Sequence, residues 1–296
     1  MSQQAETFAD RILAFTLPER DARGRMVRLD NVLDDILSAH AYPAPITLLL
    51  EEALVLCALM GSLMKRDGSQ MTMQAQTEDG PVRLLVCDYR GGEMRGYVDY
   101  DAERLNELGA NPSLFALFGK GYLAITFDTG GGQRYQGIVP LEGGSLAAAC
   151  ENYFVQSEQV PTLLRIAAST GAAGRSAAGL LVQHFPDGEE GRERLHVRLD
   201  HPDWEHVVAI AGTLTHDELL DDALSMEGMA WRLFHEDGEI RTRQAAEIVK
   251  GCRCSVEHYE KVLSRFPADE QQEMRDADGK IVVDCAFCSR KFALAI

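Results

Sequence analysis

The pattern of apolar and polar positions changes in kind along the chain. Asp30 to Ala39 places apolar residues on one face of a helix, and two prolines soon after it end that predicted helix. Ile46 to Lys65 is apolar on most faces, which predicts a long helix at the centre of the core. Glu51 and Glu52 interrupt this stretch, and charges are costly in a bilayer, so we expect a buried helix and no membrane partner.

Residues 70 to 141 instead show short alternating or apolar runs between glycine-containing turns, which is typical of antiparallel strands. Three runs predict a meander, and two more predict a hairpin around Gly130 to Gly132. A phosphate-binding loop would lead from a strand into a helix, so we interpret these glycines as a turn. The predicted strands are Met71 to Thr77, Val82 to Tyr89, Met94 to Tyr100, Tyr122 to Asp128 and Arg134 to Leu141.

Ser145 is a suitable N-cap for a following helix, after which Pro161 to Ser169 and Ala177 to Phe185 resume the character of strands. Antiparallel strands with separate helices predict an α+β fold. An acidic, glycine-containing stretch, Asp187 to Gly191, predicts a solvated break. We place the end of the first domain, residues 1–190, at this break.

Residues 191–250 predict a helical linker. Asp203 to Gly212, Thr215 to Ala223 and Leu224 to His235 have the periodicity of three short, acidic helices. Helices of this length are marginally stable alone and depend on packing against a neighbour. We therefore expect this segment to form a linker rather than a core, and to pack against the C-terminal residues that follow it.

Composition narrows the range of partners. With 296 residues and 46% hydrophobic side chains, the chain can bury a proper core. Its 29 basic and 46 acidic side chains give a net charge of −17, which repels phosphate backbones, so nucleic acid is not an expected partner. Met1 to Glu6 has no basic start leading into an apolar run, so we expect no signal peptide and a reducing, cytoplasmic location.

The candidate chemistry lies in the last 46 residues, 251–296, which hold four of the seven cysteines. A C-x-C pair and a C-x-x-C pair are separated by 30 residues, enough for a helical hairpin that returns the second pair to the first. Zinc binds four thiolates at about 2.3 Å, whereas iron–sulfur clusters usually have tighter spacings. Four structural cysteines, buried or in disulfides, are the alternative. We predict one zinc ion per chain, bound by Cys252, Cys254, Cys285 and Cys288.

Other residues offer little chemistry. The sequence has no G-x-S-x-G motif, no Walker loop and no H-E-x-x-H motif, and its adjacent carboxylates do not share a helix face. Cys57, Cys87 and Cys150 lie in apolar stretches and are interpreted as small buried hydrophobes. His258, four residues after Cys254, is near the metal site in sequence but is interpreted as an exposed helical residue. We therefore expect no enzyme activity.

Several runs together resemble the heat-shock protein 33 family over nearly the whole chain. The most specific are the Y-F-x-x-S-E-Q-x-P-T run, Tyr153 to Thr162, and the two cysteine pairs. The chain departs from the family pattern at Val256 and His258, where more basic residues are usual, and it ends eight residues after Cys288. Further similar runs are Phe15 to Pro18, Gly96-Tyr97, Tyr135 to Leu141 and Arg232 to Glu236.

The resemblance implies an ATP-independent holdase chaperone with an N-terminal α+β domain, a helical linker and a C-terminal zinc module. It implies that the zinc-bound form is inactive, and that oxidants together with unfolding stress activate it. Cys252 would then pair with Cys254 and Cys285 with Cys288, with release of zinc and unfolding of the linker. The implied partners are unfolding client proteins, a second copy of the chain in the oxidised state, and downstream ATP-dependent foldase chaperones.

Physical reasoning is consistent with such a switch. A 46-residue module cannot build a sufficient core, so zinc would supply folding free energy on the order of 10 kcal/mol. Oxidised sulfur no longer binds zinc, and a linker that loses its support would expose apolar side chains that were buried. These side chains are the candidates for client binding: Trp204, Val207, Ile210, Leu219, Leu224, Met229, Trp231, Leu233 and Phe234.

Two other functions stay open at this point. One is an α+β binding protein or enzyme with a purely structural zinc ribbon. The other is a thiol oxidoreductase that uses Cys285 and Cys288 catalytically, which would need a thioredoxin-like βαβ unit near the motif.

Overall fold

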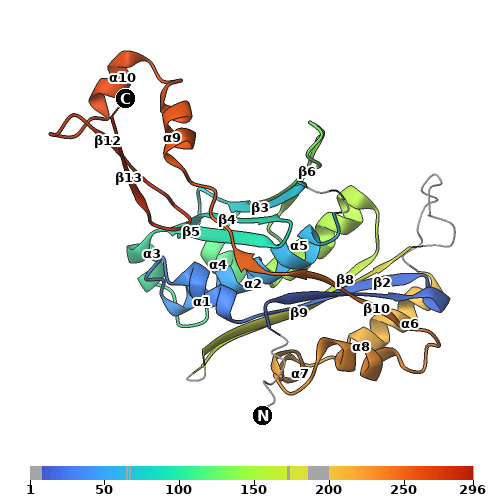
Figure 1. The fold of residues 1–296 in the computed structure, drawn as a ribbon. Coiled ribbons are helices and arrows are strands. Elements are labelled where there is room, and N and C mark those ends of the chain that lie inside the picture. The colour runs from blue at the N-terminus through green and yellow to red at the C-terminus, as the bar shows by residue number, and fades with distance from the viewer. Residues whose placement is uncertain (1–8, 65, 67, 172–173, 186–199, 296) are drawn as a thin grey trace, which may run out of the picture.

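The protein is described by a computed structural model that places residues 9–64, 66, 68–171, 174–185 and 200–295. Two sheets form the main body, and helix α2 (Ala44–Gly61) lies between them (Figure 1). A small module that carries the C-terminus projects from one end of the body, on the side of the six-stranded sheet (Figure 1). The chain therefore has the α+β fold that the sequence predicts.

The first sheet has five antiparallel strands in the order β10-β1-β2-β9-β8. The first two strands along the chain, β1 and β2, are not among the predicted elements, although Leu13, Phe15 and Leu17 of β1 alternate as a strand requires. They form a hairpin through the short helix η1 (Pro18–Arg20). The other bounds are β1 (Arg11–Leu17), β2 (Ala22–Leu29), β8 (Thr162–Gly171), β9 (Gly174–His184) and β10 (Arg241–Glu247).

The second sheet has six strands in the order β11-β5-β4-β3-β6-β7. All pairings are antiparallel except that of β11 with β5. Five of its strands agree with the predicted ones to within one residue at each end, and the glycines between β6 and β7 form the predicted turn. The strands are β3 (Gln70–Gln76), β4 (Val82–Arg90), β5 (Glu93–Tyr100), β6 (Tyr122–Asp128), β7 (Arg134–Pro140) and β11 (Val249–Lys250).

Short helices complete the body. Helices α1 (Asn31–Leu37) and α5 (Leu146–Tyr153) fall where the sequence predicts them. Ser145 caps α5, because its hydroxyl oxygen accepts a hydrogen bond of 3.2 Å from the N–H of Ala148. The remaining elements of the body are α3 (Ala102–Asn106), α4 (Leu114–Phe118) and the π-helix η2 (Phe154–Glu158).

Helix α2 is the centre of the main core, as predicted. It is long and apolar enough to cross a membrane, but 78% of its residues are buried inside the body. Its side chains fill the space between the two sheets, which is why it is apolar on most faces. The helix buries even Glu51, whose exposed fraction is 0%, and burial raises the pKa of that carboxyl to about 7.

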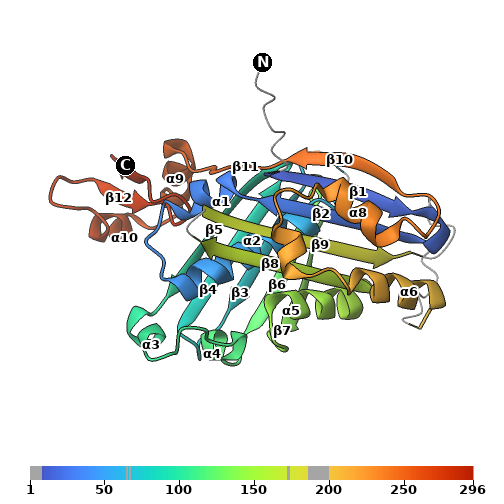
Figure 2. The same ribbon diagram turned by 90° about the horizontal axis from the view of Figure 1, so that it is seen from below.

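A second core lies on the outer face of the five-stranded sheet, under three short helices (Figure 2). Phe15 and Leu180 of the sheet and Val207 and Met229 of the helices are at most 2% exposed there. This corrects the expectation of a linker without a core, because a sheet that is apolar on both faces needs cover on both. The helices lie where they are predicted: α6 (Pro202–Ala211), α7 (His216–Leu220) and α8 (Met226–Phe234).

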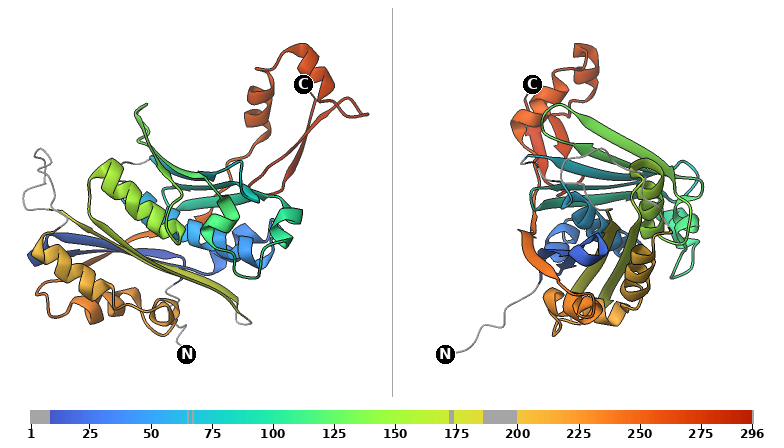
Figure 3. Two further views of the ribbon diagram at one scale, coloured as in Figure 1. Left: turned by 180° about the vertical axis from the view of Figure 1, so that it is seen from behind. Right: turned by 90° about the vertical axis from the view of Figure 1, so that its right-hand side faces the viewer.

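The three helices do not pack against the C-terminal module, contrary to expectation. They lie on the opposite side of the body from the module (Figure 1 and Figure 3). The chain between them is extended, because β10 joins the edge of the five-stranded sheet beside β1 and β11 pairs with β5. The last part of the predicted helical linker therefore consists of strands that connect the two sheets.

The proposed domain boundaries at residues 190 and 250 stay predictions. The predicted break at Asp187 to Gly191 lies outside the described residues. Strand β10 belongs to the five-stranded sheet and β11 to the six-stranded sheet, so residues 241–250 are paired with the body.

Candidate metal centre

Four sulfur atoms meet in the C-terminal module. The Sγ atoms of Cys252, Cys254, Cys285 and Cys288, here called the thiol cluster, all lie within 4.8 Å of one another. The short separations are 3.3 Å between Cys252 and Cys254, 3.5 Å between Cys254 and Cys288, and 3.6 Å between Cys252 and Cys285. A disulfide would place two sulfurs at about 2.05 Å, so all four thiols are free.

Two short helices and a strand pair return the second cysteine pair to the first. Ser255 accepts a hydrogen bond of 3.1 Å from the N–H of His258, so a helix begins directly after Cys254. His258 itself is exposed and is not part of the thiol cluster. The predicted helical hairpin is completed by a β-hairpin whose first strand ends at Asp284, directly before Cys285. The elements are α9 (Val256–Leu263), α10 (Ala268–Glu273), β12 (Ile281–Asp284) and β13 (Lys291–Leu294).

The module has little core besides the cysteines. Among its described residues, five are buried together, and one of these is itself a member of the thiol cluster. So few apolar side chains cannot stabilise a unit of this size, which is why small domains use metals or disulfides. The five are Leu263, Ile281, Cys285, Phe292 and Leu294.

The thiols differ in how readily they ionise. Burial by itself would raise the pKa of Cys285, but hydrogen bonds from the Tyr259 hydroxyl and from the backbone N–H groups of Phe287 and Cys288 lower it to about 6. Burial and the neighbouring thiols raise the pKa of Cys254. One thiolate therefore forms easily, and further thiolates in the same small volume need a cation to offset their repulsion.

The thiol cluster fits a tetrahedral metal ion. Four sulfurs at about 2.3 Å from a zinc ion lie about 3.8 Å apart, which is close to the separations of 3.3 to 3.6 Å between neighbouring sulfurs. A set of four soft thiolates favours zinc or iron over calcium or magnesium. The structure thus brings the four predicted ligands together in a group that could hold a metal ion.

The residues inside each cysteine pair anchor the module to the body. The ring of Phe287 meets the ring of Tyr97 edge-on at 4.9 Å, and the guanidinium of Arg95 lies 3.9 Å from the centre of the Phe287 ring. Arg253 binds the buried carboxylate of Asp88 at 3.1 Å, and Arg95 binds the same carboxylate at 2.6 Å. Both cysteine pairs are therefore tied to one acidic residue of β4, and nothing in the sequence pattern singles that residue out.

We predict that Phe287→Ala undocks the module without removing its metal. An aromatic pair and a cation–π contact are each worth about 1 kcal/mol, so amide hydrogen exchange at Val249 and Gly251 should accelerate about thirtyfold. Their N–H groups donate to Gly92 and Met94 of the body at 3.0 and 2.8 Å. Phe266→Ala, at an exposed phenylalanine of the same module, is the control. Equal exchange rates in the two variants would show that the Phe287 contacts do not hold the module.

Of the nine candidate client-binding side chains, five are buried in the second core and three are partly buried and pack against it. The exception is Trp231, which is 62% exposed and stacks on the ring of His235 at 4.8 Å. The expectation that it is buried is wrong for a local reason. On α8 the positions that face the sheet are spaced three and four residues apart, and Trp231 falls between them. The eight are Trp204, Val207, Ile210, Leu219, Leu224, Met229, Leu233 and Phe234.

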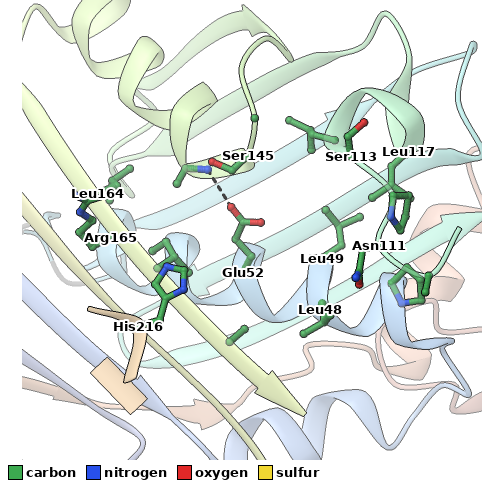
Figure 4. Close-up of a pocket in the computed structure, with 18 residues that line it drawn as sticks. Leu48, Leu49, Glu52, Asn111, Ser113, Leu117, Ser145, Leu164, Arg165 and His216 are labelled. Carbon is green, nitrogen blue, oxygen red and sulfur yellow. Dashed lines mark hydrogen bonds between the residues drawn. The ribbon is translucent and has the colours of Figure 1, made fainter. Parts of the chain in front are cut away.

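A hollow of about 520 Å³ beside α2 does not have the chemistry of an active site (Figure 4). One carboxylate oxygen of Glu52 accepts the N–H of Ala147 at 3.1 Å. The hydroxyls of Ser113 and Ser145 cap helices α4 and α5. Because these polar groups satisfy helix N-termini, they are accounted for by the fold.

The chain matches known proteins over almost its whole length. The model of a family described as "Hsp33 protein" matches residues 10–295. The "33 kDa chaperonin" of Caulobacter vibrioides is 40% identical over 294 residues, covering 96% of this chain and 94% of that protein. The protein of the same name from Ectopseudomonas mendocina is 37% identical over 283 residues, covering 94% and 90%.

A solved structure agrees with these matches. The 33 kDa chaperonin of Thermotoga maritima, described as a heat shock protein 33 homolog, superposes with a TM-score of 0.77 at 25% identity. The superposition covers 96% of this chain and 94% of that one, so it includes both sheets and the C-terminal module. Sequence and fold agree from end to end, and the chain belongs to the Hsp33 family.

Proposed function

We propose that this chain is a redox-regulated, ATP-independent holdase chaperone, which binds unfolding proteins and prevents their aggregation. The observation that carries the proposal is that four gathered thiols and an apolar sheet face under short acidic helices occur in one molecule. The relatives named 33 kDa chaperonin support the chaperone part. The protein acts by binding, and we assign it no catalytic residue.

In the reduced form, one zinc ion per chain is assigned to the thiol cluster. Zinc would supply folding free energy on the order of 10 kcal/mol and hold the two cysteine pairs together. Arg253 and Phe287 then keep the module docked on β4 and β5. With the module docked, the connecting strands stay paired and α6, α7 and α8 keep the second core covered.

Oxidation removes the metal ligands. The disulfides Cys252–Cys254 and Cys285–Cys288 are assigned from the family resemblance, and sulfurs within 4.8 Å of one another are compatible with them. Each disulfide forms when two thiols lose two electrons and two protons, which reduce one molecule of hydrogen peroxide to two molecules of water. Two disulfides consume two peroxide molecules and leave no thiolate to bind a metal ion.

The connecting strands carry this change to the second core. Strand β11 has two residues, and β10 is an edge strand whose side chains are mostly exposed, so neither is held strongly. When the module unfolds, the pairing of β11 with β5 is free to open, and β10 loses its C-terminal anchor. The short helices that precede β10 depend on packing, so they are the next to leave.

Each part of the chain has its own role in this cycle. Residues 1–190 form the chaperone body, 191–250 the stress-sensitive linker and 251–296 the redox module. The partners are unfolding clients, a second copy of the oxidised chain, and ATP-dependent foldases that accept released clients. The cytoplasm fits this cycle, because its reducing pool restores the thiols when the oxidant is gone.

Peroxide with mild heat is expected to release one zinc ion per chain and to produce anti-aggregation activity. The activity is read as suppressed light scattering by an unfolding test protein. The variant with Cys57→Ala, Cys87→Ala and Cys150→Ala is the matched control and should switch like the wild type. In the wild type the three replaced thiols are 0% exposed, and burial raises the pKa of each. An oxidant therefore does not reach a thiolate at these positions.

Other outcomes would favour other functions. A structural zinc ribbon would keep its zinc in peroxide, and a thiol oxidoreductase would turn over dithiol substrates. Strands β12 and β13 form an antiparallel hairpin instead of a βαβ unit, which argues against the oxidoreductase. A folded triple variant that peroxide fails to activate would move the switch away from the thiol cluster.

A further inference from the structure

Four of the five strands of the five-stranded sheet carry charges of one sign in a strongly acidic chain. Strands β1, β2, β8 and β9 contain six arginines and no aspartate or glutamate, although the whole chain has 46 acidic and 29 basic residues. The segment that covers the outer face of this sheet is the reverse. Residues 200–239 contain eleven aspartates and glutamates and one arginine. Sheet and cover are therefore complementary in charge as well as in apolar surface.

Two arginines of this face bind the C-terminal ends of the covering helices. Arg28 on β2 donates from Nη2 to the backbone carbonyls of Leu219 at 3.0 Å and Asp221 at 2.7 Å, where α7 ends. Arg165 on β8 donates to the carbonyl of Gly212 at 3.0 Å, where α6 ends. These carbonyls have no partner within a helix and carry its partial negative charge, so a cation is their natural ligand.

A third arginine binds carboxylates at the edge of the cover. Arg20 donates to Asp203 at 2.7 Å and to Asp237 at 2.9 Å. Asp203 lies in the first turn of α6 and Asp237 follows α8, so this one guanidinium holds both ends of the helical segment. The apolar stripe of the second core lies between these cationic positions and includes Phe15 and Leu180.

The buried side chain of Arg28 has hydrogen-bond donors that the helices do not satisfy. Arg28 is 2% exposed, and in the described part of the chain its Nε and Nη1 atoms have no hydrogen-bond partner. The Nε atom of Arg165 is likewise buried without one. Unsatisfied buried donors are costly, so a partner that offers more acceptors than the helices do would bind this face better.

We infer that this sheet face, once uncovered, is a binding surface for amphipathic helical segments with an acidic rim, and that Arg28 and Arg165 select them. The apolar side of such a segment takes the place of the second-core side chains of α6–α8. Its carboxylates and C-terminal carbonyls take the place of the linker's acceptors. In the closed form, the linker thus occupies the surface that a client segment would bind. The inference rests on the proposed function, because the face is free only after the linker has left it.

The charge of the whole protein gives this selection a physical purpose. A molecule with a net charge of −17 repels acidic segments at long range. The arginines of β1, β2, β8 and β9, strands that contain no aspartate or glutamate, reverse that field locally, where the segment loses its water and charge–charge attraction is strong. Acidic segments would otherwise be the clients that this protein holds least well.

The test uses synthetic peptides and the full-length protein, oxidised with peroxide and warmed. One labelled peptide has the sequence of residues 200–239, and the other has each aspartate and glutamate replaced by asparagine and glutamine. Fluorescence anisotropy should show the acidic peptide binding at least tenfold more tightly at low salt, with the difference shrinking at high salt. The apolar residues of the two peptides are identical, so burial of apolar surface cannot cause a difference.

Variants identify the residues that select. Arg28→Gln with Arg165→Gln should lose the preference for the acidic peptide, about tenfold. It should weaken binding of the neutral peptide much less, because that peptide keeps only the helix-end carbonyls as partners of the two arginines. Arg83→Gln with Arg134→Gln removes the same charge from exposed arginines of the other sheet and should keep the preference. If the first variant does not fold, Arg165→Gln alone tests the same point, with an expected loss of about threefold or more.

The outcomes separate this inference from the proposed function. Equal affinity of the oxidised wild type for both peptides overturns the inference even if the protein suppresses aggregation. Absence of any anti-aggregation activity overturns the proposed function itself. If the two arginines prove necessary for association of two oxidised chains in sedimentation but not for peptide binding, the occupant is a second copy and the assignment to clients is wrong.

Discussion

Phe234→Ser is expected to give the reduced, metal-loaded protein the anti-aggregation activity that the wild type gains only after oxidation. Phe234 is 0% exposed, and its ring packs 5.8 Å from that of Phe15 across the boundary between α8 and the sheet. Truncating a buried phenylalanine typically costs about 3–5 kcal/mol. A two-state element whose gap is only a few kcal/mol would then populate its open form without any change at the thiol cluster.

Helix α8 supplies its own control. Trp231 lies three residues earlier and is 62% exposed, so Trp231→Ser removes a large aromatic group without uncovering the sheet. It should leave the reduced protein inactive. Leu233→Gln, at a partly buried position that packs against the second core, should give an intermediate activity. Light scattering of an unfolding test protein under reducing conditions is the measurement, with zinc analysis of each variant in parallel.

The same experiment can contradict the coupling. Hydrogen exchange of the wild type after oxidation and mild heat should show residues 202–234 opening before the two sheets. If these residues stay as protected as the sheets while the protein is active, clients bind elsewhere, and unfolding of the linker is not the switch.

The double variant Cys285→Ser and Cys288→Ser is expected to lose bound zinc and to be active without peroxide. Removing half of the ligands abolishes a tetrahedral site, and with it folding free energy on the order of 10 kcal/mol in small zinc domains. The five side chains that are buried together among the described residues of the module cannot replace that contribution. Metal analysis and circular dichroism of the purified protein measure the two effects.

A neighbouring serine gives the matched control. Ser289 follows the second pair directly and donates to the carbonyl of Ala39 at 2.7 Å, but it is not part of the thiol cluster. Ser289→Ala should therefore retain one zinc ion per chain. Tight, stoichiometric zinc in the double variant would exclude binding by four thiolates.

Local periodicity is sufficient where neighbours in sequence are also neighbours in space. The meander of β3, β4 and β5 and the hairpin of β6 and β7 agree with the predicted strands to within one residue, because each strand pairs with the next across a short turn. Helix α2 could be recognised because no surface helix is apolar on most of its faces. The spacing of the cysteines likewise identified the four thiols that the structure brings together.

The same local rules miss β1, β2 and β10. The first two strands are short runs whose alternation is interrupted by arginines, one of which, Arg28, is buried only because α7 ends above it. Strand β10 consists mostly of exposed residues and exists because β1 offers it an open edge. Pairing at the edge of a sheet depends on the unpaired N–H and C=O groups that the edge strand presents. The sequence of the segment that pairs there does not show that such an edge exists.

By itself, the sequence determined the α+β fold, the central helix, the thiol cluster and the family to which they point. Only the tertiary structure decided that α6–α8 cover the sheet instead of the module, that Trp231 faces solvent, and that Arg253 finds Asp88 across 165 positions of sequence. The physical reason is that periodicity reports which side of an element is buried. The surface that buries it depends on a balance of packing, charge and free backbone groups over the whole molecule.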